Sequence, residues 1–237
     1  MPAFVIPPLS GATPYAAVED VESLSRWVDS GGLVVVHDSL RLSEGTEELI
    51  TQVLGYAGDW KQHCQAVGGS PGGAVPSAQA CSFLPGPWPE RLEGGLYVQS
   101  HTWCSHGDPE AVAYPLYVVE GDQEVVAQAF GRVGSRGAVV WLGFSWKGSE
   151  EAREPWARLL AKLIQDFADG LHQPPAQPSC TGERLPMDPD SAADDLESLA
   201  EDTAELLRHL VHSEARSTIR ASVSTRPQAV GPMAPLR

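Results

Sequence analysis

Basic residues are scarce in this chain of 237 residues. The sequence holds 16 Lys and Arg against 31 Asp and Glu, which gives a formal net charge of −15 and an isoelectric point of about 4.7. Binding to nucleic acid needs clustered Lys and Arg that neutralise phosphates, and docking on anionic lipid needs the same side chains. The composition therefore argues against a nucleic-acid partner and against a membrane partner.

Long hydrophobic runs are also missing. No apolar stretch approaches the roughly 20 residues that a transmembrane helix needs. The N-terminal segment MPAFVIPPLS has neither a basic start nor an apolar core of about 7–15 residues, so it does not resemble a secretory signal. We therefore expect a soluble, cytoplasmic protein.

Cysteine is rare, and no two cysteines form a CxxC pair. Without a secretory signal we expect reduced thiols. His63 precedes a cysteine, and residues 101–106 read HTWCSH, but zinc sites usually draw close ligand pairs from two places. We accordingly expect no metal and no cofactor. The four cysteines are Cys64, Cys81, Cys104 and Cys180.

The first 40 residues have the pattern of a strand, a helix and a second strand. Residues 3–7 form a short apolar run, and residues 15–30 carry apolar side chains at helical spacing. Gly31-Gly32 is suited to ending that helix, because glycine accepts a left-handed C-terminal cap. Residues 33–36 read LVVV, which is typical of a strand covered on both faces. We expect a right-handed βαβ unit.

Further elements follow up to residue 170. A helix is predicted over 46–56, strands over 96–100 and 114–119, an antiparallel pair over 124–130 and 138–143, and a helix that packs back on the sheet over 150–167. Residues 67–89 contain ten Gly or Pro residues, so we expect a long surface loop there. The predicted α/β domain spans residues 1–170.

Residues 171–237 differ in composition from the rest. A Pro-rich linker comes first, and residues 188–205 then hold eight acidic residues and no Lys or Arg. Leucines at helical spacing predict a short amphipathic helix over 194–212, followed by a disordered tail. This helix either docks loosely on its own domain or lays its apolar face in a groove of a protein partner.

Two segments resemble the class I glutamine amidotransferase-like fold, closest to its trehalose-utilisation-type variant. They are FVIPPL with the following helix, Gly-Gly and LVVVHDS, and GSRGAVVWLGFSW near residue 140. The resemblance covers about residues 3–170 and implies a flavodoxin-like, mostly parallel sheet with flanking helices. Family members have two more β-α units before the strand matched by residues 4–7. The resemblance therefore implies an N-terminally incomplete domain with an open sheet edge, which invites a protein partner.

Both catalytic landmarks of that family are altered. The family's elbow reads Gly-x-Cys-x-Gly, where a strained turn exposes a thiol, but residues 36–40 read VHDSL. The family's base is the histidine of a His-Pro-Glu, but residues 144–147 read FSWK. We therefore do not expect glutamine hydrolysis by that mechanism. We expect a non-catalytic, amidotransferase-like binding or scaffolding domain rather than an enzyme.

Two site hypotheses remain open at the carboxyl ends of the strands, where open α/β sheets carry their sites. One is a small polar ligand site. The other is a hydrolase in which Ser39 is the nucleophile and His37 or His101 the base. His37 and Ser39 share a face of the strand while Asp38 does not, so three consecutive residues cannot form a triad. The residues predicted to line the ligand site are His37, Asp38, Ser39, Ser145 and Trp146.

Overall fold

A computed structural model describes residues 3–8, 17–37, 44–69, 72–95, 97–121, 124–147 and 149–176. The predicted helix over 194–212 and the disordered tail lie outside these residues. In chain order the elements are β1 (Ala3–Ile6), α1 (Val18–Asp29), β2 (Leu33–His37), α2 (Glu44–Leu54), β3 (Trp60–Gln62), β4 (Ala66–Gly69), β5 (Ala74–Pro76), α3 (Ala80–Phe83), β6 (Gln99–Thr102), β7 (Ser105–His106), β8 (Ala111–Val119), β9 (Glu124–Arg132), β10 (Ala138–Leu142) and α4 (Glu150–Ala168).

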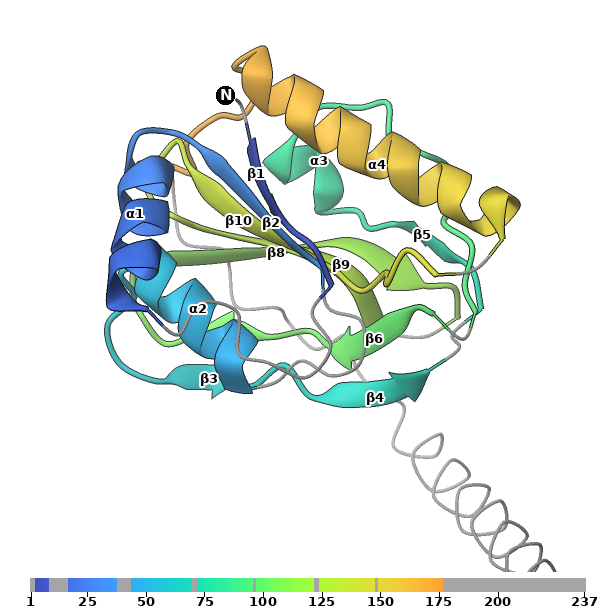
Figure 1. The fold of residues 1–237 in the computed structure, drawn as a ribbon, viewed down its shortest axis with the longest axis horizontal. Coiled ribbons are helices and arrows are strands. Elements are labelled where there is room, and N and C mark those ends of the chain that lie inside the picture. The colour runs from blue at the N-terminus through green and yellow to red at the C-terminus, as the bar shows by residue number, and fades with distance from the viewer. Residues whose placement is uncertain are drawn as a thin grey trace, which may run out of the picture. The chain divides into compact units, whose positions relative to one another are not determined.

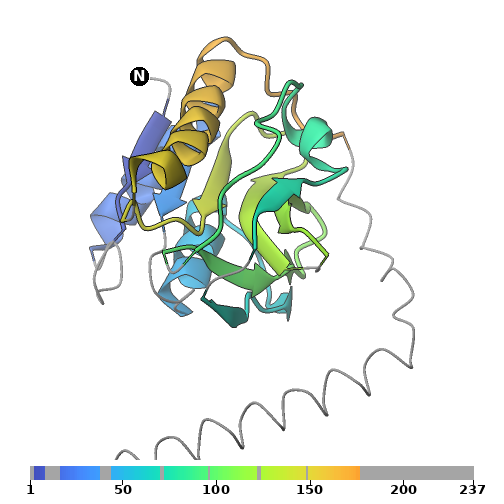
Figure 2. The ribbon, with the colours of Figure 1, turned by 90° about the vertical axis from the view of Figure 1, so that its right-hand side faces the viewer.

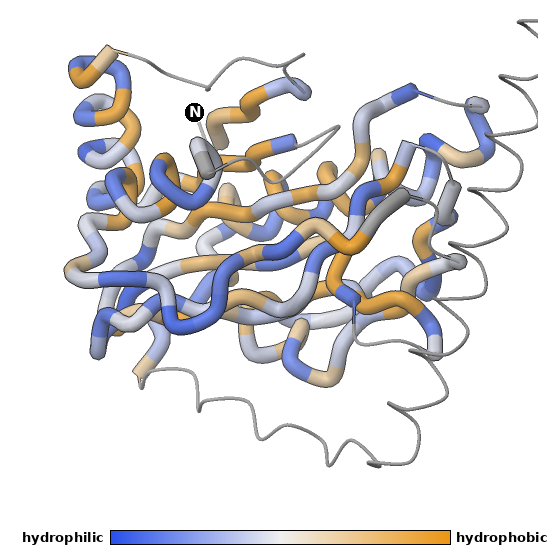
Figure 3. Tube along the Cα trace, turned by 90° about the horizontal axis from the view of Figure 1, so that it is seen from below, coloured by the Kyte–Doolittle hydropathy of each residue, from blue (hydrophilic) through white to orange (hydrophobic). Residues whose placement is uncertain are grey.

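The domain is an α/β structure in which helices cover both faces of one sheet (Figure 1; Figure 2). The strand β2 is buried along its whole length, as the run of LVVV predicted. Leu33 and Val35 join the core beneath α3 and α4, whereas Val34 and Val36 join the core beneath α1 and α2. Hydrophobic and hydrophilic residues alternate along the helices, as expected of elements that bury one side (Figure 3).

The sheet is mixed, and only its first part is parallel. Parallel ladders join β1 to β2 and β2 to β10, while β9 pairs antiparallel with β10, β8 and β6. The short connection between β9 and β10 enforces an antiparallel pair, and the strands beyond β9 continue in that sense. The sheet is therefore less parallel than the resemblance implies. None of the described helices combines the length and hydrophobicity that crossing a bilayer requires.

The elements predicted from strong local patterns are confirmed. The helix α1 ends as expected at Gly31-Gly32: Gly31 has a φ of +93°, and the N–H of Gly32 donates to the carbonyl of Trp27 at 3.0 Å. The helix α4 begins at Ser149, whose hydroxyl accepts from the N–H of Ala152 at 3.3 Å. It packs back on the sheet through buried residues that include Trp156.

The prediction of a structureless loop over 67–89 is wrong. This stretch contributes to β4 and contains β5 and the short helix α3. The strands are held by distant partners, since β4 pairs with β6 and β5 pairs with β8. Glycine and proline weaken a strand locally, but pairing along an existing sheet overrides that preference. The Pro76 at the end of β5 fits this rule, because proline is tolerated at the margins of a sheet.

The compact part of the chain continues past residue 170. The ring of His172 stacks on Phe167 with centroids 4.6 Å apart, and its Nδ1 hydrogen-bonds to the carbonyl of Arg136 at 3.0 Å. The carbonyl of Pro175 accepts from the N–H of Gly134 at 2.9 Å. The first residues of the predicted linker thus pack against the turn between β9 and β10.

Candidate functional site

The predicted site lies where β2 and β10 end side by side. His37 closes β2, and its partner in the parallel ladder is Leu142, the last residue of β10. Ser145 and Trp146 follow within four residues. The end of β2 at His37 and the segment that carries Ser145 and Trp146 therefore lie next to each other. Asp38 and Ser39, also predicted to line the site, lie outside the described residues.

His37 is held by hydrogen bonds within the domain. The indole N–H of Trp146 donates to the ring, with Nε1 lying 3.1 Å from Nδ1 and 3.4 Å from Nε2 of His37. The ring also forms a hydrogen bond with the backbone of Phe144. A neutral imidazole has one donor and one acceptor, so these contacts use both. Burial lowers the pKa of His37 to about 4, which keeps the ring uncharged at neutral pH.

Trp146 has an unusual backbone conformation. Its φ is +60°, and among the described residues it is the one non-glycine residue with a positive φ. Such strain is kept where the surroundings enforce it, and it occurs often at functional sites. Here the indole ring is fixed against His37 and Phe144, each with centroids 5.3 Å away. Beside it, the hydroxyl of Ser145 is buried without a hydrogen-bond partner among the described residues.

His101 lies on the other face of the sheet from His37. Its ring packs on Trp141 with centroids 4.3 Å apart, and Trp141 belongs to the core beneath α1 and α2. Side chains alternate along β2, so His37 points instead to the face that carries Leu33 and Val35. His37 and His101 therefore cannot act together on one substrate, which separates the two bases considered for Ser39.

A surface cleft is present at the opposite ends of the same strands. Its volume is about 290 Å³. Gly31 precedes β2 and Arg136 precedes β10, so this cleft lies at the amino ends and does not coincide with the predicted ligand site. The lining residues are Ser30, Gly31, Arg136, Phe167, Gly170, His172, Gln173 and Pro174.

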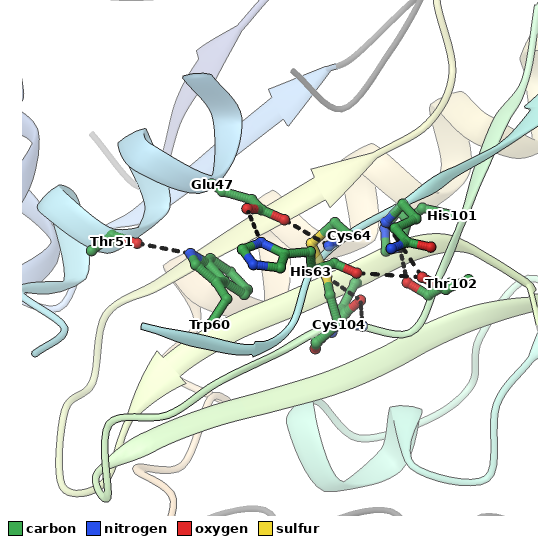
Figure 4. Close-up of a disulfide and its surroundings, with 10 residues drawn as sticks. Glu47, Thr51, Trp60, His63, Cys64, His101, Thr102 and Cys104 are labelled. Atoms are coloured by element: carbon green, nitrogen blue, oxygen red, sulfur yellow. Dashed lines mark hydrogen bonds and ion pairs between the residues drawn. A yellow bond between two sulfur atoms is a disulfide. The ribbon is translucent and has the colours of Figure 1, made fainter. Parts of the chain in front are cut away.

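The expectation of reduced thiols is wrong for two of the four cysteines. Cys64 and Cys104 form a buried disulfide, although they are 40 residues apart in the sequence (Figure 4). Cys64 lies between β3 and β4, and Cys104 lies between β6 and β7. The pairing of β3 with β7 and of β4 with β6 brings the two segments together. Cys81 is free and exposed, as expected, and Cys180 lies outside the described residues.

The surroundings of the disulfide hold residues that the sequence analysis did not select. Glu47 of α2 accepts a hydrogen bond from the N–H of Cys64 at 2.6 Å and lies 2.9 Å from Nδ1 of His63 (Figure 4). Across the disulfide, the amide N–H of Gln128 donates to the carbonyl of Cys104 at 2.7 Å. The sequence signal was the nearness of His63 to Cys64 and of His101 to Cys104. The sequence did not show the strand pairing that joins the segments of Cys64 and Cys104.

Comparisons with known proteins provide little further evidence. No protein-family model matches the chain, and no curated protein is significantly similar to it. Among solved structures, the exo-β-1,4-mannosidase Op5Man5 from Opitutaceae bacterium strain TAV5 is 14% identical and has a TM-score of 0.36. The match covers 73% of this chain and 26% of the mannosidase. Because the chain spans about a quarter of that protein at so low a score, the likeness carries no conclusion about family or activity.

Proposed function

We propose that this domain is a non-catalytic binding or scaffolding module with an amidotransferase-like arrangement. The observation that carries the proposal is the bonding of His37, the one described histidine at the carboxyl ends of β2 and β10. Its donor and its acceptor are both occupied, by the backbone of Phe144 and the indole of Trp146. A general base needs a free lone pair directed at its substrate, so His37 serves here as a structural contact.

The sheet order supports the amidotransferase-like, flavodoxin-like part of the proposal. In such a fold the elbow and the base follow two strands whose carboxyl ends must be neighbours. The strands β2 and β10 meet this requirement, because they pair in parallel and end in register at His37 and Leu142. This pairing is consistent with an amidotransferase-like domain in which the nucleophile and the base have been replaced.

The same geometry ranks the remaining site hypotheses. A small polar ligand at His37, Ser145 and Trp146 is the second choice. The side chains of His37 and Trp146 are hydrogen-bonded to each other and the hydroxyl of Ser145 is buried, so these groups are less available to a ligand. Ser39 as a nucleophile ranks third. We retain the cytoplasm as the proposed location, although a disulfide there is uncommon unless it takes part in redox chemistry.

Hydrolysis is tested by comparing the full-length chain with its Ser39→Ala variant on activated esters. Both proteins are expected to show the same rate, indistinguishable from that of buffer with an inert protein. The reason is that the ring of His37, the histidine two residues before Ser39 in the sequence, is already hydrogen-bonded to Trp146 and to the backbone of Phe144. A rate that falls at least about 100-fold in Ser39→Ala would contradict the proposal and establish the hydrolase, since removal of a nucleophile costs at least that much.

The surface proposed for binding is the outer edge of β1. This strand lies at the margin of the sheet and pairs, among the described residues, with β2. It exposes the large hydrophobic side chain of Val5, which is 38% accessible. An edge of this kind accepts an extended peptide as an additional strand, with affinity from the backbone and specificity from alternate side chains.

This surface is tested with a random peptide library displayed on phage and selected on the immobilised full-length chain. Enriched peptides are expected to alternate polar and apolar residues and to bind Val5→Lys at least about tenfold more weakly, because a charge there disfavours strand addition. Val18→Lys is the matched control, since Val18 is 71% exposed on α1, away from β1. Peptides that bind Val5→Lys as tightly as the native chain would place the binding surface elsewhere.

A further inference from the structure

His101 has the hydrogen-bonding pattern of a metal-binding histidine. Its Nδ1 lies 2.6 Å from the carbonyl of Thr102, and since a carbonyl only accepts, Nδ1 carries the proton. The lone pair is then on Nε2, which is fully buried and has no hydrogen-bond partner among the described residues. Metal-binding histidines are typically oriented in this way, with the distal N–H held by a backbone carbonyl.

Two sulfur atoms lie beside this lone pair. The ligand atoms of Cys64, His101 and Cys104 all lie within 4.8 Å of one another, and all three residues are buried. The two cysteines are also held by neighbouring side chains. Glu47 accepts a hydrogen bond from the N–H of Cys64, and Gln128 donates one to the carbonyl of Cys104. The site is therefore built from second-sphere contacts as well as from the three candidate ligands.

We propose that Cys64, His101 and Cys104 bind one Zn²⁺ ion when the disulfide between the two cysteines is reduced. Two thiolates and one neutral imidazole form a ligand set that zinc accepts in tetrahedral geometry, with the fourth position left for water. Once the bond between the sulfurs is broken, they separate to roughly 3.8 Å, the spacing of two thiolates around tetrahedral zinc. Disulfide and zinc are thus alternative cross-links between the same two segments.

The exchange between the two states balances with a small-molecule thiol as the reductant. Two molecules of thiol reduce the disulfide, giving two cysteine thiols and one oxidised, disulfide-linked molecule of the reductant. Zinc binding then releases the two thiol protons, because only thiolates are ligands.

The test uses the full-length Cys81→Ser/Cys180→Ser chain, in which Cys64 and Cys104 are the remaining thiols. The protein is reduced with a phosphine, freed of metal by a chelator and titrated with Co²⁺. We expect a thiolate-to-cobalt charge-transfer band and the intense visible bands of tetrahedral cobalt, which saturate at one ion per chain and disappear on addition of one equivalent of Zn²⁺. The oxidised chain is expected to show neither band.

His101→Gln in the same background tests the nitrogen ligand. It is expected to bind Co²⁺ at least about tenfold more weakly and with shifted visible bands. His106→Gln is the matched control. His106 is a buried histidine outside the cluster, and its Nε2 has no hydrogen-bond partner in the described part of the chain. Cobalt binding by this variant is expected to equal that of the parent. Circular dichroism of each oxidised variant verifies folding independently of metal.

Zinc K-edge X-ray absorption of the reduced, zinc-loaded parent gives the ligand count without any histidine variant. Two sulfur neighbours and one imidazole are expected. The proposal is overturned if the reduced parent shows no charge-transfer band, if His101→Gln binds cobalt as tightly as the parent, or if the absorption spectrum lacks either the sulfur pair or the imidazole.

Discussion

Replacing both Cys64 and Cys104 by alanine is expected to lower the free energy of unfolding by about 4 kcal/mol. The disulfide closes a loop of 40 residues, and a cross-link over that distance removes this much conformational entropy from the unfolded chain. Both side chains are buried, so the variant also loses their packing. For a domain of this size the expected fall in melting temperature is about 8 to 16 °C.

Urea unfolding and thermal scans of the native and double-alanine chains measure this effect. Cys81→Ala is the control, since the side chain of Cys81 is exposed and unpaired, and its stability is expected to stay within about 0.5 kcal/mol of the native value. The scans are run without a reducing agent, so that the native chain keeps the disulfide between Cys64 and Cys104. Equal stability of the native and double-alanine chains would show that the disulfide does not form in solution.

The elements that the sequence predicted well have a complete local signal. For α1 and β2 the sequence contains the apolar stripe, the Gly31-Gly32 terminator and the buried run of β-branched residues. The residues that set each boundary of these elements therefore lie within a few positions of that boundary. The pair β9 and β10 is similar, since a short glycine-containing turn joins the two strands. The helix α4 combines the cap at Ser149 with an apolar face that reaches Trp156.

The elements that the sequence missed depend on residues far along the chain. The strands β4 and β5 contain or border glycine and proline, and they exist because β6 and β8 supply the hydrogen bonds. The disulfide was missed for the same reason, since two cysteines 40 residues apart become neighbours only after β3 and β4 pair with β7 and β6. The spacing of residues along the sequence predicts none of these pairings.

For the candidate site, the sequence predicted that two strand ends meet, but it did not predict how their side chains bond. The strand ends at His37 and Ser145-Trp146 do come together, which follows from the parallel arrangement of β2 and β10. Trp146, which donates the hydrogen bond to His37, has a positive φ. No pattern of residues in the sequence predicts that backbone conformation. The same bond occupies the imidazole lone pair that a general base would need.

Lowering the pH from 7 to 4 is expected to destabilise the domain, with His37 contributing about 3 kcal/mol. The pKa of this histidine is about 4 in the folded state and 6.5 in the unfolded state, because burial disfavours the charged ring. The unfolded chain therefore binds a proton that the folded chain does not, so stability is complete above pH 6.5 and falls as the pH drops to about 4. A difference of 2.5 units corresponds to about 3 kcal/mol. Burial lowers the pKa of His172 as well and adds to the loss.

Urea midpoints across this pH range, combined with NMR titration of the histidine rings, measure the effect. In His37→Gln the dependence of stability on pH is expected to be weaker by up to one proton. The pKa values of His37 and His101 both lie at about 4, so one of two ring signals that titrate near pH 4 should disappear, while that of His101 remains. Asp108 affects the stability of the domain over a separate range of pH. Hydrogen bonds from the N–H groups of Ala57 and Glu110 lower its pKa, so its contribution is lost only below the ordinary value of 3.8. A native chain whose stability is constant between pH 7 and 5, or a His37 ring that titrates near 6.5, would mean that the bond to Trp146 does not hold the ring in a buried, neutral state.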